Sequence, residues 1–177
     1  KGVGFFYARS STKKIQPFLF GGSQERNMRA GTENIYGIAG MAKALEIAYT
    51  NLEENKKYIE DLKSYLLKNL KENFSSIVFN GDTENKCLFT IVNVGFNLKN
   101  SEVLTPDKQD MLLFNLDIAG IAVSGGSACS SGTNIGSHVL KALKADESKT
   151  SIRFSLSKFN TKKEVDYLIK TLKEILE

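Results

Sequence analysis

The sequence predicts an α/β or α+β fold in which helices pack on a small mixed sheet. Segments with the 3.6-residue apolar period of a helix alternate with short Val/Ile/Phe-rich segments typical of strands. Their order is helix, strand, strand, helix, strand, helix, strand, helix, which is typical of helices covering a sheet. Hydrophobic residues make up 41% and charged residues 25% of the 177 residues, so the chain has the composition of a globular protein with one sizeable core.

The first 33 residues are expected to belong to something larger. Residues 2–8 form a Phe/Tyr/Val-rich segment that predicts a strand. Residues 21–34 are polar, interrupted by glycines, and carry Arg26 and Arg29, so we interpret them as a functional loop. The chain also opens abruptly on Lys1, directly before an apolar segment. We therefore expect an excised fragment that begins with the last strands of a larger domain.

Residues 35–73 predict one very long helix. Apolar side chains recur at helical spacing along the whole range, with a shift in the stripe near Asn51. We expect a kink between Asn51 and Asn55.

The remaining chain predicts further strands and helices in alternation. The strands are expected at 77–79, 88–96, 118–123 and 151–155. Helices are expected from Pro106 to about residue 116, at 138–143 and at 161–176. Pro106 suits the first position of its helix with Thr105 as cap, and Thr161 with Glu164 forms a capping box.

Charge and hydropathy favour some function classes over others. The net charge is only +4, and the lysines alternate with glutamates along the helices, which indicates a solvated face and no nucleic-acid partner. No apolar run approaches the roughly 20 residues needed to span a bilayer, so no membrane association is expected. No metal site is expected either.

The two cysteines have different surroundings. Cys87 lies in an apolar segment and is expected to be a small buried core residue. Cys129 lies among serines and glycines, where an exposed thiol persists only under reducing conditions, so we expect a cytoplasmic protein.

Cys129 and Arg153 are the candidate site residues, and each has two interpretations. The Ser/Gly-rich loop at 124–135 is expected to be mobile, and Cys129 is either a nucleophile on this loop or an inert surface thiol. Arg153, alone among apolar neighbours, needs a planar anion as partner, which is either a protein carboxylate or a substrate carboxylate.

Three segments carry a resemblance to a known family. They are 21–34 (Gly-Gly-Ser-Gln-Glu-Arg through Arg-Ala-Gly-Thr-Glu-Asn), 127–132 (Ser-Ala-Cys-Ser-Ser-Gly) and 151–156 (Ser-Ile-Arg-Phe-Ser-Leu). In sequence, order and approximate spacing they resemble the NifS-like cysteine desulfurases of the class V aminotransferase family. Residues 120–124 also lead into the cysteine loop as they do in that family. The resemblance covers essentially the whole chain.

The resemblance implies a fold-type I pyridoxal-phosphate enzyme, of which this chain is a C-terminal part. Residues 1–33 would be a remnant of the large cofactor-binding domain, and 34–177 the small domain, beginning with a long connecting helix. Such enzymes take sulfur from L-cysteine as an enzyme persulfide, release L-alanine and pass the sulfur to an acceptor protein for iron–sulfur clusters or thio-modification.

Individual roles follow from the same resemblance. Cys129 would carry the persulfide, and Arg153 would bind the substrate carboxylate. Thr32 would reach the cofactor phosphate of the neighbouring subunit in a homodimer, and the Gly31 amide is a plausible second phosphate donor by its chemistry. Arg26 and Arg29 add positive charge there or pair with nearby glutamates.

The resemblance also implies what the chain lacks. The family's Schiff-base lysine has no counterpart, because Lys1 matches a later lysine, so the chain alone is expected to be inactive. His138 is expected at the surface, with Ser137 as a helix cap. Alternatives are a stand-alone sulfur-carrier or binding domain without catalysis, or another class V enzyme such as a selenocysteine lyase or an aminotransferase.

Overall fold

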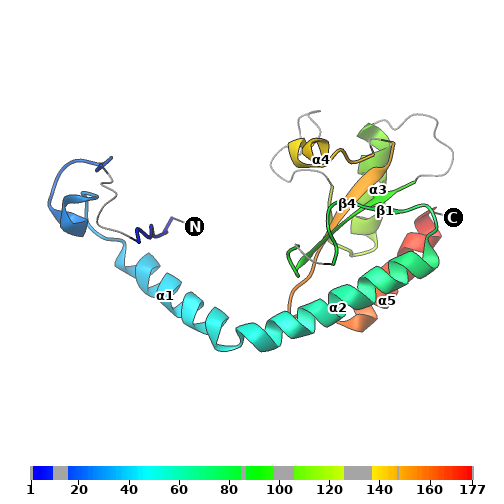
Figure 1. Ribbon diagram of the computed structural model, residues 1–177, viewed down its shortest axis with the longest axis horizontal. Coiled ribbons are helices and arrows are strands. Elements are labelled where there is room, and N and C mark those ends of the chain that lie inside the picture. The colour runs from blue at the N-terminus through cyan, green and yellow to red at the C-terminus, as the bar shows by residue number, and fades with distance from the viewer. Residues whose placement is uncertain are drawn as a thin grey trace. The chain divides into compact units, whose positions relative to one another are not determined.

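The computed structural model describes residues 2–9, 16–84, 87–97, 106–125, 137–146 and 148–176, with the element labels of Figure 1. The chain divides into two compact units, Lys1–Leu52 (unit 1) and Glu53–Glu177 (unit 2). The division falls at a break between two helices, and the expected domain boundary at residue 33 stays a prediction.

Unit 1 contains a 3-10 turn, η1 (Gln24–Asn27), and helix α1 (Ile35–Thr50). The Asn34 side chain caps α1 by accepting a hydrogen bond from the Gly37 amide at 3.1 Å. The strand predicted at 2–8 was wrong, because residues 2–9 form no strand. A strand needs a hydrogen-bonded neighbour, and the described residues of unit 1 provide none.

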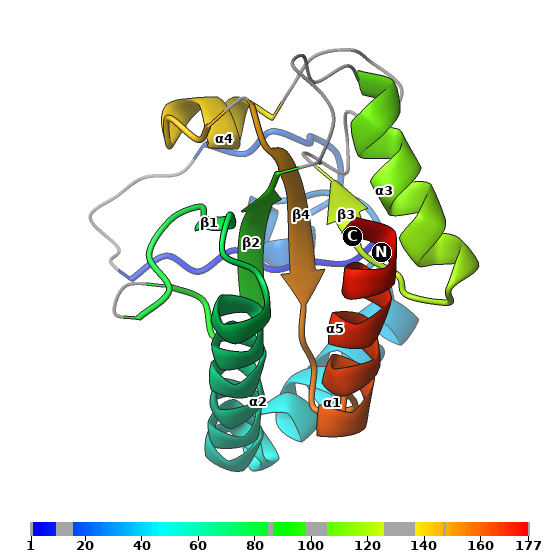
Figure 2. The ribbon, with the colours of Figure 1, turned by 90° about the vertical axis from the view of Figure 1, so that its right-hand side faces the viewer.

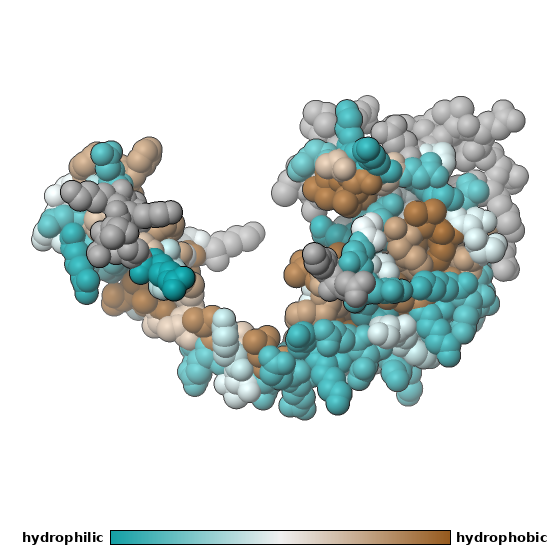
Figure 3. All heavy atoms as spheres, in the orientation of Figure 1, coloured by the Kyte–Doolittle hydropathy of each residue, from teal (hydrophilic) through white to brown (hydrophobic). Residues whose placement is uncertain are grey.

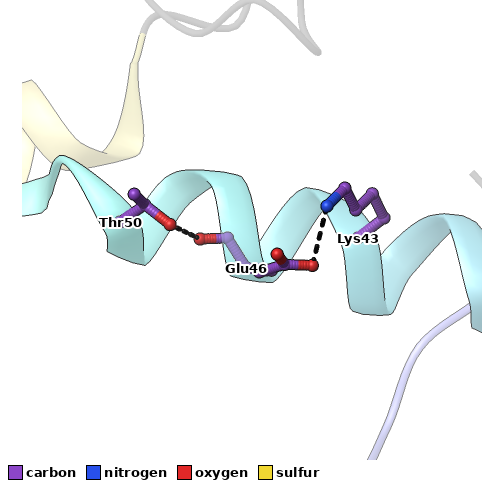
Figure 4. A network of polar contacts seen from close by, with 3 residues as sticks. All are labelled: Lys43, Glu46 and Thr50. Atoms are coloured by element: carbon purple, nitrogen blue, oxygen red, sulfur yellow. Dashed lines mark hydrogen bonds and ion pairs between the residues drawn. The ribbon is translucent and has the colours of Figure 1, made fainter.

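Helix α1 contributes no buried side chain. Its apolar residues lie at the surface, where Figure 3 shows hydrophobic atoms along the helix. Polar contacts on its last turns are local: Lys43 pairs with Glu46 at 2.9 Å, and the Thr50 hydroxyl donates to the Glu46 carbonyl (Figure 4). The helix is therefore held by its own backbone and by such short-range contacts, together with one long hydrogen bond of 3.4 Å from its cap Asn34 to the Gly2 carbonyl.

Unit 2 begins with helix α2 (Leu52–Asn73). Asn51, with φ −120° and ψ 26°, interrupts the helical backbone between α1 and α2. The predicted kink near Asn51 is thus confirmed, as a break between two helices. The inner side of α2 is apolar, and its buried leucines are Leu62, Leu66 and Leu70.

The sheet of unit 2 has the strand order β1-β2-β4-β3 (Figure 2). Its strands are β1 (Val78–Phe79), β2 (Ile91–Phe96), β3 (Ser124–Gly125) and β4 (Thr150–Ser155). Every pairing among these described strands is antiparallel, so the sheet is not the mixed one expected. The register of β2 against β4 runs from Ile91↔Ser155 to Phe96↔Thr150.

The two faces of this sheet differ in polarity. On one face, the core is built from side chains of β2, β4, α2, helix α3 (Pro106–Ile118) and helix α5 (Lys162–Leu176). Phe96 lies in this core, with edge-on contacts to Phe74 and Phe154. Because side chains alternate along a strand, Asn93 and Arg153 lie on the opposite face. That face carries the candidate site.

The end of α3 explains an error in the predicted strands. Gly120 has φ +75°, its amide donates to the Asp117 carbonyl, and the Ile121 amide donates to the Leu116 carbonyl. These bonds form a Schellman motif, which ends a helix. The strand predicted at 118–123 was therefore wrong, and pairing begins only at Ser124.

The other helix ends agree with the predictions. Ser137 caps the short helix α4 (His138–Ala142) through the Leu140 amide, and His138 is exposed. At the start of α5, the Glu164 carboxylate accepts from the Thr161 amide at 2.6 Å, and the Thr161 hydroxyl accepts from the Glu164 amide. This reciprocal pair is the predicted capping box. The Thr105 cap expected for α3 lies outside the described residues.

Cys87 does not occupy the buried position expected of it. The predicted strand 88–96 begins only at Ile91, so Cys87 lies in the connection before β2 and is exposed. None of the helices in the described ranges is long and apolar enough to cross a membrane.

Candidate functional site

Arg153 is the centre of the candidate site on the polar face of the sheet. It lies on β4, opposite Asn93 of β2 and Ser124 of β3. Its Nη2 donates to the Ser124 hydroxyl at 3.4 Å, a long and therefore weak hydrogen bond. Its Nε is buried and has no hydrogen-bond partner among the described residues. A buried N–H without a partner is costly, so Arg153 is suited to accept an anionic partner.

No carboxylate supplies that partner in the part of the chain that the structure describes. The ion pairs found there join neighbouring residues on α1, α2 and α5. An intramolecular carboxylate, one of the two partners considered for Arg153, is therefore not seen among these residues. This favours an anion from outside, which a guanidinium binds with two parallel hydrogen bonds.

Asn93 lies beside Arg153 in a row of polar side chains across the sheet. The Asn80 side-chain amide, just after β1, donates to the Asn93 carbonyl oxygen at 2.7 Å and to the Ser151 hydroxyl at 3.0 Å. Since the oxygen of Asn93 is engaged, its own NH₂ group is the part left to act as a donor. The row therefore presents N–H donors on both β2 and β4.

The cysteine loop starts at this arginine. Ser124, the Arg153 partner, is the first residue of the loop predicted at 124–135. Cys129 and the rest of the loop, residues 126–135, lie outside the described residues, so its predicted mobility stays a prediction. The near end of the loop is nevertheless fixed: β3 pairs with β4 directly at Arg153.

Gly31 and Thr32, the predicted phosphate-binding residues, lie together in unit 1. Thr32 is exposed, and the Gly31 amide donates to the Gln24 side-chain oxygen at 3.1 Å. Gly31 has φ +99°, a backbone conformation that residues with a Cβ rarely adopt, so glycine suits this position. The hydroxyl of Thr32 and the Gly31 amide are donors of the type that holds a phosphate, but a phosphate would have to replace Gln24 as the acceptor of the Gly31 amide.

The polar loop of unit 1 contains two arginines and a strained backbone segment. Arg29 Nη1 donates to the Ala30 carbonyl at 2.7 Å, and no ion pair joins Arg26 or Arg29 to Glu25 or Glu33 among the described residues. Glu25, Arg26 and Asn27 all have left-handed backbone angles, with φ between 48° and 65°. Consecutive non-glycine residues in this region are strained, and such strain is concentrated at functional segments.

Sequence reasoning missed Ser124, Asn93 and Asn80. Asn93 could have been identified from the sequence, because it is the one amide side chain inside an otherwise apolar strand. Asn80 could not, since a turn asparagine is common and its contact with Ser151 joins residues 71 positions apart.

Solved structures have the same fold. A NifS-like protein from Rickettsia africae matches with a TM-score of 0.71 and 30% identity, covering 93% of this chain and 41% of that one. A second NifS-like protein matches with a TM-score of 0.74 and 35% identity, covering 96% of this chain and 41% of that one. Helices on a small antiparallel sheet with this topology thus define the chain as part of a fold-type I pyridoxal-phosphate fold.

Sequence comparison identifies the family. Residues 1–168 match the Aminotransferase class-V family, and the chain belongs to it. It is 38% identical over 179 residues to a protein from Dictyoglomus turgidum named cysteine desulfurase IscS. That match covers 100% of this chain but only 43% of the relative, so the chain spans less than half the length of the relative it resembles.

Proposed function

We propose that the chain is part of a pyridoxal-phosphate-dependent cysteine desulfurase that takes sulfur from L-cysteine as a persulfide on Cys129 and releases L-alanine. The observation that carries the proposal is the incomplete hydrogen bonding of Arg153. Its Nε is buried without a partner, and its guanidinium hydrogen-bonds to the residue at which the cysteine loop begins. An anion-binding group at the base of a thiol-bearing loop supports substrate binding and sulfur transfer at one place.

In this mechanism Arg153 binds the carboxylate of L-cysteine and so orients the substrate. The Cys129 thiolate attacks the substrate sulfur, a new S–S bond forms, the C–S bond breaks, and the three-carbon product leaves as alanine. Protons balance without another reactant, since one thiol and one cysteine give one persulfide and one alanine. The sulfur then passes to an acceptor protein, for iron–sulfur cluster assembly or thio-modification.

The cofactor phosphate is assigned to Thr32 and the Gly31 amide. Both donors are of the type that binds phosphate, and the exposed Thr32 hydroxyl is accessible from outside unit 1. This supports a homodimer in which the phosphate belongs to the neighbouring subunit. When bound, pyridoxal phosphate supplies the electron sink for chemistry at the substrate α-carbon. A cytoplasmic location, expected from the thiol chemistry, is part of the same proposal.

The test is Cys129→Ala in the complete enzyme that contains this sequence. Persulfide and alanine formation should be lost, because only the sulfur-transfer step needs the thiol. Cofactor absorbance should persist, since phosphate binding uses other residues. Cys87→Ala is the matched control and should keep its turnover. Near-normal turnover of the Cys129 variant would mean that another residue is the nucleophile.

A further inference from the structure

A second thiol, outside the Arg153 site, accepts a hydrogen bond from a lysine. Lys63 lies on α2 and is buried, with 5% of its surface exposed. Its Nζ donates one hydrogen bond to Cys87 Sγ at 3.1 Å and one to the Leu88 carbonyl at 2.9 Å. The bond to the Leu88 carbonyl, next to the thiol, thus helps to keep the Lys63 nitrogen at hydrogen-bonding distance from the Cys87 sulfur.

Cys87 and Lys63 differ in their access to solvent. Cys87 is exposed, whereas Lys63 reaches the sulfur from the protein side. Both line a cavity of about 230 Å³, which Ser64, Glu84 and Phe89 also line. A small reagent can therefore reach the sulfur through this cavity while the lysine nitrogen stays in place.

The hydrogen-bond partners of Lys63 do not balance its charge. No carboxylate forms an ion pair with Lys63 within the described ranges. A buried ammonium whose partners are one carbonyl and one sulfur costs free energy, because neither carries the full opposite charge. A covalent bond from this nitrogen to sulfur removes the charge without moving either side chain far.

We propose that Lys63 and Cys87 are an oxidative modification site, at which a peroxide converts them to a reversible nitrogen–sulfur bridge. In the first step the Cys87 sulfur attacks hydrogen peroxide, an S–O bond forms, the O–O bond breaks, and water leaves. In the second step the Lys63 ammonium gives one proton to solvent, its nitrogen attacks the sulfenic sulfur, an N–S bond forms, and the hydroxyl takes the second nitrogen-bound proton and leaves as a second water. One thiol, one ammonium and one peroxide give one sulfenamide, two waters and one proton, and the peroxide accepts the two electrons.

The bridge would tie α2 to the connection that leads into β2, and α2 and β2 themselves share the core. A thiol such as glutathione or dithiothreitol attacks the sulfenamide sulfur and restores both side chains. The modification is independent of the proposed desulfurase chemistry, because neither residue belongs to the Arg153 site.

The test is peptide mapping by mass spectrometry of the complete protein after treatment with hydrogen peroxide. The peptides of Lys63 and Cys87 should appear joined, with the loss of two hydrogens, and should separate after dithiothreitol. Lys63→Arg retains the charge but removes the amine, so Cys87 should then accumulate as sulfenic or sulfinic acid. Lys57→Arg, an exposed lysine on the same helix, is the control that should still form the bridge.

Three results would overturn the proposal. They are an unmodified Cys87, a Cys87 oxidised without a link to Lys63 in the unsubstituted protein, and a disulfide from Cys87 to another cysteine. The linked peptide is read in the unsubstituted protein, so the test does not depend on how well a variant folds.

Discussion

On the polar face of the sheet, the backbone of Arg153 is fixed by strand pairing, while its side-chain Nε–H has no acceptor among the described residues. Strand pairing sets Arg153 opposite both Asn93 and Ser124, but one hydrogen bond of 3.4 Å is all that restrains its guanidinium among the described residues. The arginine is therefore positioned by the backbone and free to bind with its side chain. A carboxylate bound there would satisfy the buried Nε that now has no partner.

We predict that Arg153→Ala weakens the binding of L-cysteine in the complete enzyme. Loss of a bidentate carboxylate contact costs on the order of 2–4 kcal/mol, so kcat/KM for L-cysteine should fall by roughly 30- to 1,000-fold, mostly through KM. Steady-state alanine formation measures it. Arg153→Lys keeps the charge without the planar pair of donors and should recover only part of the loss. An unchanged KM in both variants would show that the carboxylate binds elsewhere.

The residue roles were predicted unevenly, for a physical reason. Arg153 and Cys129 are conspicuous in sequence, because each is an unusual residue type among its neighbours. The contact of Arg153 with Ser124 and the contact of Asn80 with Asn93 and Ser151 depend on strand order and register. Local sequence does not determine either of these, so no pattern indicated them.

At the scale of elements, the helices are defined by local signals that the structure retains. Capping residues and apolar periodicity specified α4, α5 and the break at Asn51, and these act within one or two turns. The predictions of strands at 2–8 and 118–123 were wrong because strand formation depends on a partner that is distant in sequence. Apolar, β-branched residues favour a strand, but only pairing with a neighbour makes one, and Gly120 instead ends α3 with a Schellman motif.

The capping box of α5 gives a stability prediction. Thr161→Ala removes the acceptor for the Glu164 amide at the start of the helix and should lower the free energy of unfolding by about 1 kcal/mol. Thr161→Ser keeps the hydroxyl and should have a much smaller effect. Denaturant unfolding of the three proteins measures the difference. Equal midpoints for the alanine and serine variants would show that the hydroxyl does not contribute.

The contact between α2 and α5 gives a prediction of pH dependence. The Tyr65 hydroxyl donates to the Asp166 carboxylate at 2.6 Å, and this hydrogen bond, with desolvation and the carboxylate charge, raises the pKa of Tyr65 above 10.0. The folded state therefore holds the phenol proton more tightly than the unfolded state. This contribution to stability is complete below the unfolded pKa and is lost as pH rises through the folded one.

Tyr65→Phe removes the titrating group and so tests the direction of this pH dependence. Above about pH 10, the free energy of unfolding should fall more steeply with pH in the unsubstituted chain than in the variant. Urea unfolding from about pH 8 to about pH 11 measures both slopes. Parallel slopes would show that Tyr65 titrates alike in the folded and unfolded states.

At the scale of the whole molecule, the chain spans 43% of the relative from Dictyoglomus turgidum, and it contains residues proposed for two different tasks. Substrate and sulfur chemistry is assigned to unit 2, and phosphate binding to unit 1. The cofactor lysine of the family is expected to have no counterpart among the lysines of this chain. The chain by itself should therefore contain part of a working site.

This expectation is tested by mixing the purified chain with pyridoxal phosphate and reducing with borohydride. Labelling should be scattered over exposed lysines at low occupancy, because the resemblance implies no counterpart of the cofactor lysine in this chain. Peptide mapping of the reduced chain measures the distribution. One lysine labelled stoichiometrically would contradict the prediction and would identify a cofactor lysine that the resemblance does not imply.

Helix α1 affects the order in which the chain acquires its structure. None of its side chains is buried, so it gains nothing from the hydrophobic collapse that assembles α2, α3, α5 and the sheet. A helix of 16 residues with no buried side chain is marginal in water, because nucleation is costly and few hydrogen bonds offset it. In this chain alone, α1 should therefore form and melt as a separate event from the core of unit 2. Its backbone amides should be among the first to exchange with solvent, and its apolar side chains should stay in contact with water after the core of unit 2 has formed.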